Sequence, residues 1–545
     1  MNIALVATYS HPIALGLRYI SAVLKAHGHH VEMFLMQSKR ATAKASFSPS
    51  LISELAERTR SADIIGMSLM TNTFHRACAL TKAVRTAGHK AQIVWGGPHP
   101  TTALEESLEA ADIVCIGEGE YATLELAGML EEGKDPTAIA GLAFRSNGKI
   151  IRNPVAPLRD NLNEYPFPDY DLSTHWVAMQ DHFEPATPEN LRGALHRYRI
   201  ETTRGCPYSC TFCTNAALMR IYRGKGTWVR KRSNENIIQE IEQARAQFPT
   251  IEAVNVIDDL FFVRSEEDIE EFSRLYEERV NLPLELDAFP NTISRTKVRS
   301  LARLPIALIS MGIQSGSQDT LKHIYKRPTP LKTIVDGINI LADHKIRAEY
   351  HYLVNNPFEP ESNRIETLRF AAAHHRPPAI LRVFPLQFYP GTPLFDRARE
   401  EGLIQDRHES AYRFTYTGKT HLLDSGYLDI WLRVVLNLRN AGVPRGAVHA
   451  LVTFVTHPRV RYLLDRKWFA PFSYGVYRIG RFIMRKLIYQ PFIRPLRRLR
   501  GKGRYEKRLS PEEAPLPIST RPPVPATNQA KETADWQTCA TDKEV

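Results

Sequence analysis

Residues 202–215 read TTRGCPYSCTFCTN and place Cys206, Cys210 and Cys213 in a C-x3-C-x2-C pattern. Thiolates bind soft metals and iron–sulfur clusters. A structural zinc site needs four ligands, but no fourth Cys is nearby and residues 198–288 contain no His. Three thiolates leave one coordination position open, and in a four-iron cluster the fourth iron could then bind a substrate or a cofactor directly. The pattern therefore predicts an open cluster site in a loop.

The cysteines follow the first strand of a region in which apolar strand-like runs alternate with helical patterns. The helical pattern SNENIIQEIEQARAQF, for example, begins with Ser233 and Asn234 as start signals. Six βα units predict a partial, TIM-like (β/α)6 barrel, in which the chemistry gathers at the carboxyl ends of the strands. The six predicted strands are residues 199–203, 253–257, 284–288, 306–314, 348–354 and 381–387.

A second alternating region precedes the barrel. Its five strand-like runs alternate with helical patterns, which predicts an α/β fold with a doubly wound, Rossmann-type parallel sheet. Ligands bind such sheets at the carboxyl ends of the strands, so the loops at residues 9–15, 70–74, 96–101 and 117–121 are candidate binding loops. The predicted strands are residues 3–7, 31–36, 63–69, 91–97 and 112–119.

These patterns divide the chain into five parts. The stretch rich in Pro, Asp and Asn around NEYPFPDYDLS lacks periodicity and is predicted to be a linker. The Pro-rich, polar C-terminal end is predicted to be disordered. The predicted parts are residues 1–150 (first sheet domain), 151–195 (linker), 196–420 (barrel), 421–508 (helical, basic region) and 509–545 (disordered tail).

Six cysteines in 545 residues do not make a disulfide scaffold, and no signal peptide or transmembrane stretch is visible. A cytoplasmic location is therefore expected. Cys78 and Cys115 lie in apolar contexts typical of small core residues, and Cys539 in the predicted tail is expected to have no role.

The positive charge of the chain is concentrated in one segment. Residues 459–508 contain 16 Lys or Arg and 2 Asp or Glu, a local charge of +14, so the rest of a chain whose total is +12 carries −2. Aromatic and aliphatic residues lie among these cations, which favours peripheral contact with an anionic membrane over nucleic-acid binding. The alternative is a helical lid that packs on the barrel with its cations in solvent. The segment also suggests a lipid-like substrate.

The cysteine pattern resembles that of the radical S-adenosylmethionine superfamily. The resemblance implies that Cys206, Cys210 and Cys213 hold three irons of a four-iron, four-sulfur cluster. The fourth iron then chelates S-adenosylmethionine, and one electron from the cluster cleaves this cofactor to a 5′-deoxyadenosyl radical that abstracts hydrogen from an unactivated carbon. The electron would come from a donor such as flavodoxin or ferredoxin. No catalytic acid, base or nucleophile is evident in the sequence.

The same resemblance implies contacts to S-adenosylmethionine at the ends of three later strands. The segment VIDDLFF would contact the amino group of S-adenosylmethionine, MGIQSGS its carboxylate or ribose, and FYPGTPL its adenine. Paired Asp residues can instead cap a helix, and Gly residues can serve turns only. The implied residues are Asp258, Asp259, Gln314, Ser315, Tyr389 and Gly391.

The first region resembles the cobalamin-binding domain that precedes the radical domain in one large subfamily. That domain often carries D-x-H-x-x-G, then S-x-L, then G-G. The resemblance implies cobalamin contacts at Ser68, Gly96, Gly97, His99 and Gly117. The chain departs from the first motif, because Ile13 stands where the axial His is expected and His11 where the Asp is expected. Two options follow, cobalamin without this protein ligand or a retained fold that has lost the cofactor.

The resemblance as a whole implies a cobalamin-dependent radical enzyme that methylates an unactivated carbon of a small molecule. A radical cyclase, oxidative or rearrangement enzyme of the porphyrin- or hopanoid-precursor type is the first alternative. The second is a non-catalytic iron–sulfur or cobalamin-binding protein. The first region contains neither G-x-G-x-x-G nor a P-loop pattern, and the chain has no G-x-S-x-G, so nucleotide binding and serine hydrolysis are not supported.

Overall fold

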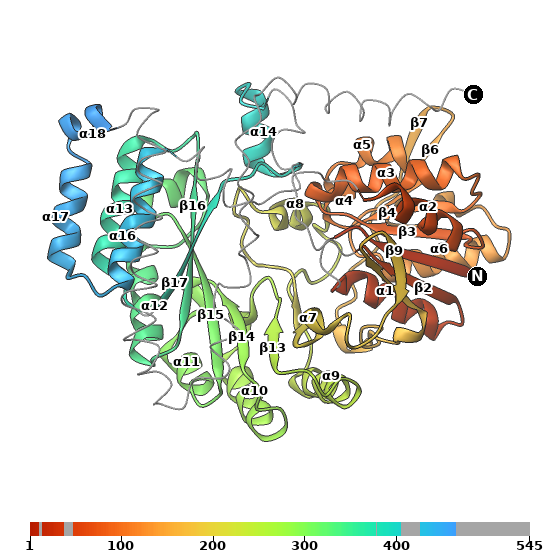
Figure 1. The fold of residues 1–545 in the computed structure, drawn as a ribbon, viewed down its shortest axis with the longest axis horizontal. Helices are drawn as coiled ribbons and strands as arrows, with labels where there is room; N and C mark the ends of the chain where they lie inside the picture. Colours follow the sequence, from red (N-terminus) through yellow and green to blue (C-terminus); the bar gives the residue numbers. More distant parts are fainter. Residues whose placement is uncertain (10–12, 37–46, 378, 405–411, 413–425, 465–545) are drawn as a thin grey trace. The chain divides into compact units, whose positions relative to one another are not determined.

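The computed structural model describes residues 1–9, 13–36, 47–377, 379–404, 412 and 426–464. It consists of two compact units, and each is described by itself. The larger unit comprises Met1–Asn363 and Pro378–Thr417, and the other comprises Arg364–Pro377 and Gly418–Val545. The larger unit contains two sheets (Figure 1).

The first sheet has nine strands in the order β7-β6-β5-β4-β3-β1-β2-β8-β9. Its five central strands are parallel, as the sequence predicts, and residues 3–7 of β1 are almost completely buried. The strands are β1 (Asn2–Ala7), β2 (His30–Leu35), β3 (Ile64–Ser68), β4 (Gln92–Gly96), β5 (Ile113–Cys115), β6 (Leu142–Ser146), β7 (Lys149–Arg152), β8 (His175–Met179) and β9 (His182–Pro185).

The helices of this domain form two groups. Helix α1 packs against α6, and α3 packs against α2 and α5, the arrangement of a doubly wound sheet with helices on both faces. The helices are α1 (Leu15–Ala26), α2 (Pro49–Arg58), α3 (Phe74–Thr86), α4 (Pro98–Thr102), α5 (Leu104–Ala110) and α6 (Glu120–Glu131).

The structure differs from the sequence-based prediction at residues 151–195. The predicted linker contains β8, which pairs with β2, and β9, which pairs with β8. These strands have five and four residues, too few for a clear period-two pattern to emerge from the sequence. The other domain boundaries proposed from the sequence stay predictions.

The second sheet is the predicted incomplete barrel. Six parallel strands follow one another in the order β10-β13-β14-β15-β16-β17, and helices α9 to α12 run around the outside (Figure 1). The strands are β10 (Arg197–Ile200), β13 (Ala253–Val256), β14 (Leu284–Ala288), β15 (Ile306–Gln314), β16 (Ala348–Val354) and β17 (Ala379–Pro385), with a separate two-stranded ribbon of β11 (Thr203–Arg204) and β12 (Arg230–Lys231).

Five of these six strands begin and end within two residues of the prediction. The exception is the first strand, β10, which ends at Ile200, before the predicted end at residue 203. The chain then enters β11 before the cysteine loop. The helices are α7 (Arg192–Leu195), α8 (Thr214–Ile221), α9 (Asn234–Gln247), α10 (Glu266–Arg279), α11 (Arg295–Leu301), α12 (Leu331–Asp343) and α14 (Pro393–Glu400). Ser233 caps α9 by accepting from the Asn236 amide, as expected for a start signal.

The smaller unit is helical. It holds most of α13 (Glu361–His374), together with α16 (Tyr427–Asn440), α17 (Arg445–Val455) and α18 (Pro458–Leu464). His375 bonds Asn440 at 2.9 Å, and Arg439 donates to the His375 carbonyl at 3.0 Å. Within the described ranges, no helix is both long and apolar enough to cross a membrane. The predicted tail 509–545, with Cys539, and residues 465–508 of the basic segment lie outside these ranges.

Candidate active site

The cysteine loop is held by a carboxylate at its base. Asp258, just after β13, accepts hydrogen bonds from the amides of Thr202 and Thr203, the latter at 3.0 Å, and from the Thr202 hydroxyl. Arg264 donates to the Thr202 carbonyl at 3.1 Å. Burial raises the pKa of Asp258 to about 6, although these hydrogen bonds lower it. Asp258 therefore anchors the backbone that leads into the loop.

The three thiols of the loop lie close enough to influence one another electrostatically. Cys210 is buried, and Cys206 and Cys213 are half-buried. Burial, with a smaller contribution from the neighbouring thiols, raises the pKa of Cys206 to about 11 and that of Cys213 to about 12. Burial also raises the pKa of Cys210, whereas the Arg327 guanidinium acts to lower it. A metal or cluster would have to displace these protons, as thiolate ligation requires.

Aromatic rings shield the loop. Tyr208 stacks on Phe289 with ring centroids 3.7 Å apart, and Arg327 lies over the same Phe289 ring at 3.9 Å. Phe212 meets Tyr325 edge-on at 5.1 Å. In the described part of the chain, no three His, Cys, Asp or Glu side chains converge on a position for a single metal ion. The mutually interacting, ring-covered thiols fit a cluster that takes one ligand on each of several irons.

The two adjacent aspartates predicted to contact S-adenosylmethionine lie in different environments. Asp258 is 5 % exposed and fully engaged with the backbone. Asp259 lines a cavity and accepts a hydrogen bond from the side-chain amide of Asn215 at 2.7 Å. Only Asp259 therefore has its carboxylate at a surface where a cofactor could approach.

The other predicted contacts are also divided. Gln314 ends β15 in a left-handed conformation with φ of 70°, whereas Ser315 is buried and donates to Glu359 at 3.2 Å. The Tyr389 carbonyl accepts from the Thr392 hydroxyl at 2.7 Å. Gly391 has φ of 76°, and a Cβ there would lie 3.0 Å from Thr102 of α4. The backbone near Gly391 thus serves a close approach between the two sheet domains.

A cavity that is partly open to solvent lies between the strand ends of the first domain and the cysteine loop. Its wall includes Ser68 from the first domain and Asn215 and Asp259 from the second. Glycine is frequent in the part contributed by the first domain, at positions 16, 66, 96, 97, 117 and 119. A Cβ on Gly97, which has φ of 98°, would lie 2.9 Å from the Leu69 carbonyl oxygen. The chain therefore packs closely against Leu69 at Gly97.

This wall fits a large cofactor such as cobalamin, because several glycines expose backbone where a ligand can approach. Among the residues predicted to bind cobalamin, Ser68, Gly96, Gly97 and Gly117 line the cavity. His99 is buried instead in an aromatic cluster with Phe74 and Tyr412, with ring centroids at 5.0 and 5.3 Å.

The predicted axial position is apolar. Ile13 is buried in a cluster with Leu15 and Tyr19. His11, which stands at the Asp position of the motif, lies outside the described residues.

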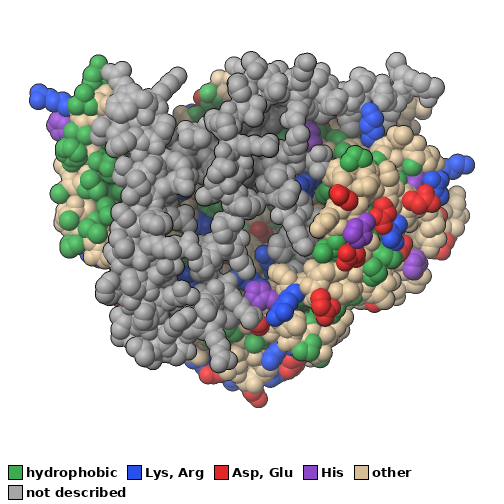
Figure 2. All heavy atoms as spheres, in the orientation of Figure 1, with side chains coloured by type: hydrophobic (Ala, Val, Ile, Leu, Met, Phe, Trp, Pro, Cys, Tyr) green, Lys and Arg blue, Asp and Glu red, His purple; other side chains and the backbone are tan. Residues whose placement is uncertain are grey.

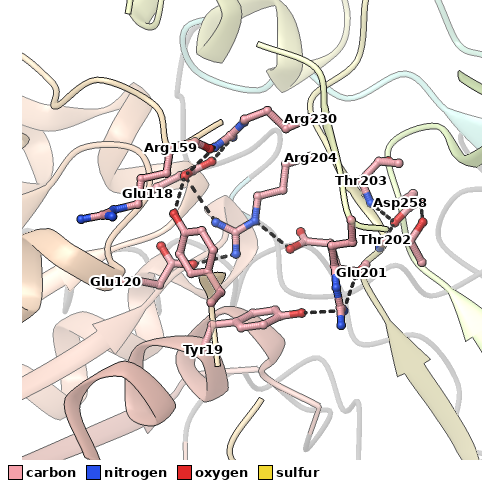
Figure 3. Close-up of polar contacts among 12 residues, drawn as sticks. Tyr19, Glu118, Glu120, Arg159, Glu201, Thr202, Thr203, Arg204, Arg230 and Asp258 are labelled. Carbon is pink, nitrogen blue, oxygen red and sulfur yellow. Dashed lines mark hydrogen bonds and ion pairs between the residues drawn. The ribbon is translucent and has the colours of Figure 1, made fainter. Parts of the chain in front are cut away.

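A group of charged residues, which we call the Arg204 cluster, joins the two domains beside this cavity (Figure 3). Arg204 lies 3.3 Å from Glu118 and 2.7 Å from Glu120 of the first domain, and 2.8 Å from Glu201 of its own domain. Arg230 also pairs with Glu118. Because Arg204 is two residues before Cys206, these ion pairs tie the cavity wall to the cysteine loop.

The sequence did not reveal this cluster. Glu118 and Glu120 lie in the candidate binding loop at residues 117–121, and Arg204 lies in the stretch that carries the cysteines. The rule that carboxyl ends of parallel strands carry binding loops was the available signal. The partners, Arg204 and Glu120, are 84 residues apart in the chain.

Glu118 makes the stability of this contact depend on pH. Burial acts to raise the pKa of Glu118, but the charges of Arg204 and Arg230 outweigh it and the pKa is lowered. A lowered folded-state pKa stabilises the fold above the unfolded pKa, about 4.3, and this contribution is lost as the pH falls through the folded-state value.

We therefore expect Glu118→Gln to lower the unfolding free energy at pH 7 by about 3 kcal/mol, since two buried guanidinium groups lose a shared carboxylate. The difference from the unchanged protein should shrink as the pH falls below about 4.3. Chemical unfolding from pH 7 to pH 3 measures it. A difference that stays constant over this range would show that the charge of Glu118 is not responsible.

Two family models match the chain. The model of the B12 binding domain matches residues 1–127, and that of the Radical SAM superfamily matches residues 200–371. The chain belongs to the cobalamin-binding radical S-adenosylmethionine enzymes. The family uses a four-iron, four-sulfur cluster, S-adenosylmethionine and cobalamin.

Relatives of this radical enzyme include an uncharacterised methyltransferase of Pyrococcus horikoshii, which is 26% identical over 68% of this chain and 79% of the relative. An anaerobic magnesium-protoporphyrin IX monomethyl ester cyclase of Synechocystis is 23% identical over 77% of this chain and 80% of the relative. The structure of the methyltransferase TsrM from Kitasatospora setae, with cobalamin and a 4Fe-4S cluster bound, shares the fold with a TM-score of 0.58. It is 17% identical, and the match covers 73% of this chain and 78% of TsrM.

Proposed function

We propose that this radical enzyme methylates an unactivated carbon of a small-molecule substrate, with cobalamin as the methyl carrier. One observation carries the proposal. The cavity beside the predicted cobalamin-binding residues Ser68 and Gly97 is also lined by Asn215 and Asp259, which follow or face the cysteine loop. A methyl carrier and a radical source must act on one substrate, and a shared cavity brings their sites together.

In this proposal Cys206, Cys210 and Cys213 hold the cluster. Asp259 and Gln314 contact S-adenosylmethionine. When bound, the cluster and S-adenosylmethionine supply the radical that removes hydrogen from carbon, and cobalamin supplies the methyl group.

The protein's own residues orient and enclose these groups. Asp258 keeps the backbone before the cysteine loop in place through three hydrogen bonds. Tyr208, Phe289 and Arg327 exclude water from one side of the loop. Ser68, Gly96, Gly97 and Gly117 would hold cobalamin, and the apolar Ile13 would offer it no His ligand.

Radical cyclisation or rearrangement without methyl transfer is the second candidate. The likeness to the anaerobic cyclase over 77% of this chain favours it, as does the absence of the motif His at residue 13. Both candidates use the same cluster chemistry and differ in whether the methyl group moves.

Product analysis separates the two candidates. Reconstituted enzyme, incubated without oxygen with S-adenosylmethionine, reductant and a metabolite extract, should form both 5′-deoxyadenosine and S-adenosylhomocysteine, and a product 14 mass units heavier than its substrate. Enzyme prepared without cobalamin is the control and should form neither S-adenosylhomocysteine nor the heavier product. Formation of 5′-deoxyadenosine alone by the complete enzyme would contradict methyl transfer and favour the second candidate.

An acidic electron donor of the flavodoxin or ferredoxin class is the proposed redox partner, because the cluster must receive one electron. Peripheral contact of residues 459–508 with an anionic membrane is proposed from their charge. The described beginning of this segment supports it, since Tyr462 is 71% and Leu463 65% exposed beside Arg459 and Arg461, and Phe454 on the preceding helix is 60% exposed. Figure 2 shows hydrophobic side chains gathered over α17.

Flotation with vesicles of anionic phospholipid tests this contact. The full-length chain should float at low salt and release at high salt, because each Lys or Arg near such a surface contributes about 1 kcal/mol that salt screens. A chain that ends at Pro458 should remain in the dense fraction. Equal cobalamin content in the two proteins would show that both are folded. Equal flotation of the two chains would contradict membrane contact through this segment and leave the alternative of a helical lid on the barrel.

A further inference from the structure

The barrel sheet has one packed face and one open face. On the packed face most side chains of β14 to β16 are at most 9% exposed, namely Leu284, Leu286, Ala288, Ile309, Met311, Ile313, Ala348, Tyr350, Tyr352 and Val354. At the alternate positions most side chains are half-buried or exposed, and Arg382 and Phe384 of β17 are exposed. Parallel sheets are normally covered on both faces. The open face therefore calls for an occupant.

Polar groups form two adjacent rows on this face. The strand register aligns Asp287, Ser310 and Glu349 in one row. In the next row it aligns Gly312 with His351, and His351 with Arg382.

The carboxylates of the first row differ in their partners. Glu349 is paired with His351 at 2.8 Å and with Arg382 at 3.0 Å. Burial raises the pKa of Asp287, and the neighbouring His351 and a hydrogen bond with Ser310 act against this rise. Among the described residues, no cationic nitrogen lies within 4.0 Å of the Asp287 carboxylate. Glu349 is thus neutralised by protein groups, whereas Asp287 retains capacity to accept hydrogen bonds from a ligand.

The rows lie below the proposed S-adenosylmethionine contact. Gln314 ends β15, two residues beyond Gly312 and four beyond Ser310, which places the rows about 7 and 13 Å down the strand. The Gln314 amide folds back over Gly312, because a Cβ on Gly312 would lie 2.5 Å from its nitrogen. A molecule on these rows would therefore extend toward the radical source.

We propose that the open face binds the substrate, and that the substrate is a polar molecule whose hydroxyl or amino groups donate hydrogen bonds to Asp287 and His351. The proposal rests on the proposed function for the position of the radical source. An apolar lipid at this face would leave a carboxylate and an imidazole without hydrogen bonds, which is unfavourable. The inference therefore replaces the lipid-like substrate expected from the sequence.

The test uses the full-length, reconstituted enzyme and two probes, the aqueous methanol fraction and the chloroform fraction of metabolites from the cells that encode it. The aqueous fraction should raise 5′-deoxyadenosine formation at least tenfold above the rate without substrate. Asp287→Asn and His351→Gln should each lose at least ninety per cent of this stimulation. Both should keep the iron and cobalamin content of the unchanged enzyme. Asp336→Asn, on the exposed Lys332 ion pair of α12, is the matched control and should respond like the unchanged enzyme.

A second measurement does not depend on turnover. Equilibrium dialysis of the purified stimulating compound should show at least tenfold weaker binding to Asp287→Asn. Stimulation by the chloroform fraction, by neither fraction, or equally in Asp287→Asn would overturn the proposal. Stimulated 5′-deoxyadenosine formation without S-adenosylhomocysteine would instead remove methyl transfer and support the polar binding face.

Discussion

Replacing Cys206, Cys210 or Cys213 by Ala is expected to abolish cleavage of S-adenosylmethionine. Loss of a second-shell partner typically costs 10- to 100-fold in metal affinity or activity, so loss of a direct ligand should lower cleavage by more than about 100-fold. The pKa of each of the three thiols is raised by burial, and residues 198–288 contain no fourth Cys and no His that could replace one of them.

The measurement is iron and sulfide content after anaerobic reconstitution, together with 5′-deoxyadenosine formation. Cys78→Ala and Cys115→Ala are the controls, because both thiols are buried in the first sheet domain, and both variants should keep the cluster and the cleavage. A variant at any of the three positions with full cluster content and full cleavage would refute the assignment.

Replacing Arg204 by Met is expected to separate the cobalamin domain from the cysteine loop. The Arg204 side chain is 12% exposed, and it pairs with Glu118, Glu120 and Glu201. Removing one partner of a buried ion pair leaves uncompensated charge and costs about 3–5 kcal/mol. We therefore expect the unfolding free energy to fall by about this amount, and cobalamin retained through gel filtration to fall about tenfold or more. The Arg204→Lys variant should keep part of the unfolding free energy and part of the bound cobalamin.

Arg279→Met is the matched control. Arg279 lies 2.7 Å from Glu235 and 2.5 Å from Glu242, but the three side chains are 27%, 49% and 40% exposed. Exposed pairs of this kind contribute up to about 1 kcal/mol. The control should therefore unfold almost as the unchanged protein does and keep its cobalamin. If the two Arg variants behave alike, the Arg204 cluster does not hold the domains together.

Periodicity in the sequence was sufficient to predict most strands. Residues 284–288, 306–314 and 348–354 were predicted as strands and are β14, β15 and β16. Buried parallel strands read as apolar runs bounded by turns, so local sequence identifies them. The strands β8 and β9 could not be identified in this way, because they are short and their pairing depends on other strands, β8 on β2 and β9 on β8.

The sequence by itself determined that three closely spaced cysteines follow a barrel strand, since spacing along the chain is local information. Only the tertiary structure decided which neighbouring side chains face the cavity. Asp258 and Asp259 are adjacent in the loop after β13, yet their carboxylates have different surroundings. Asp258 is bound to Thr202 and Thr203, and Asp259 lines the cavity. Likewise, only folding brings Glu118 and Glu120 to Arg204, because ion-pair partners are set by distance in space and not along the chain.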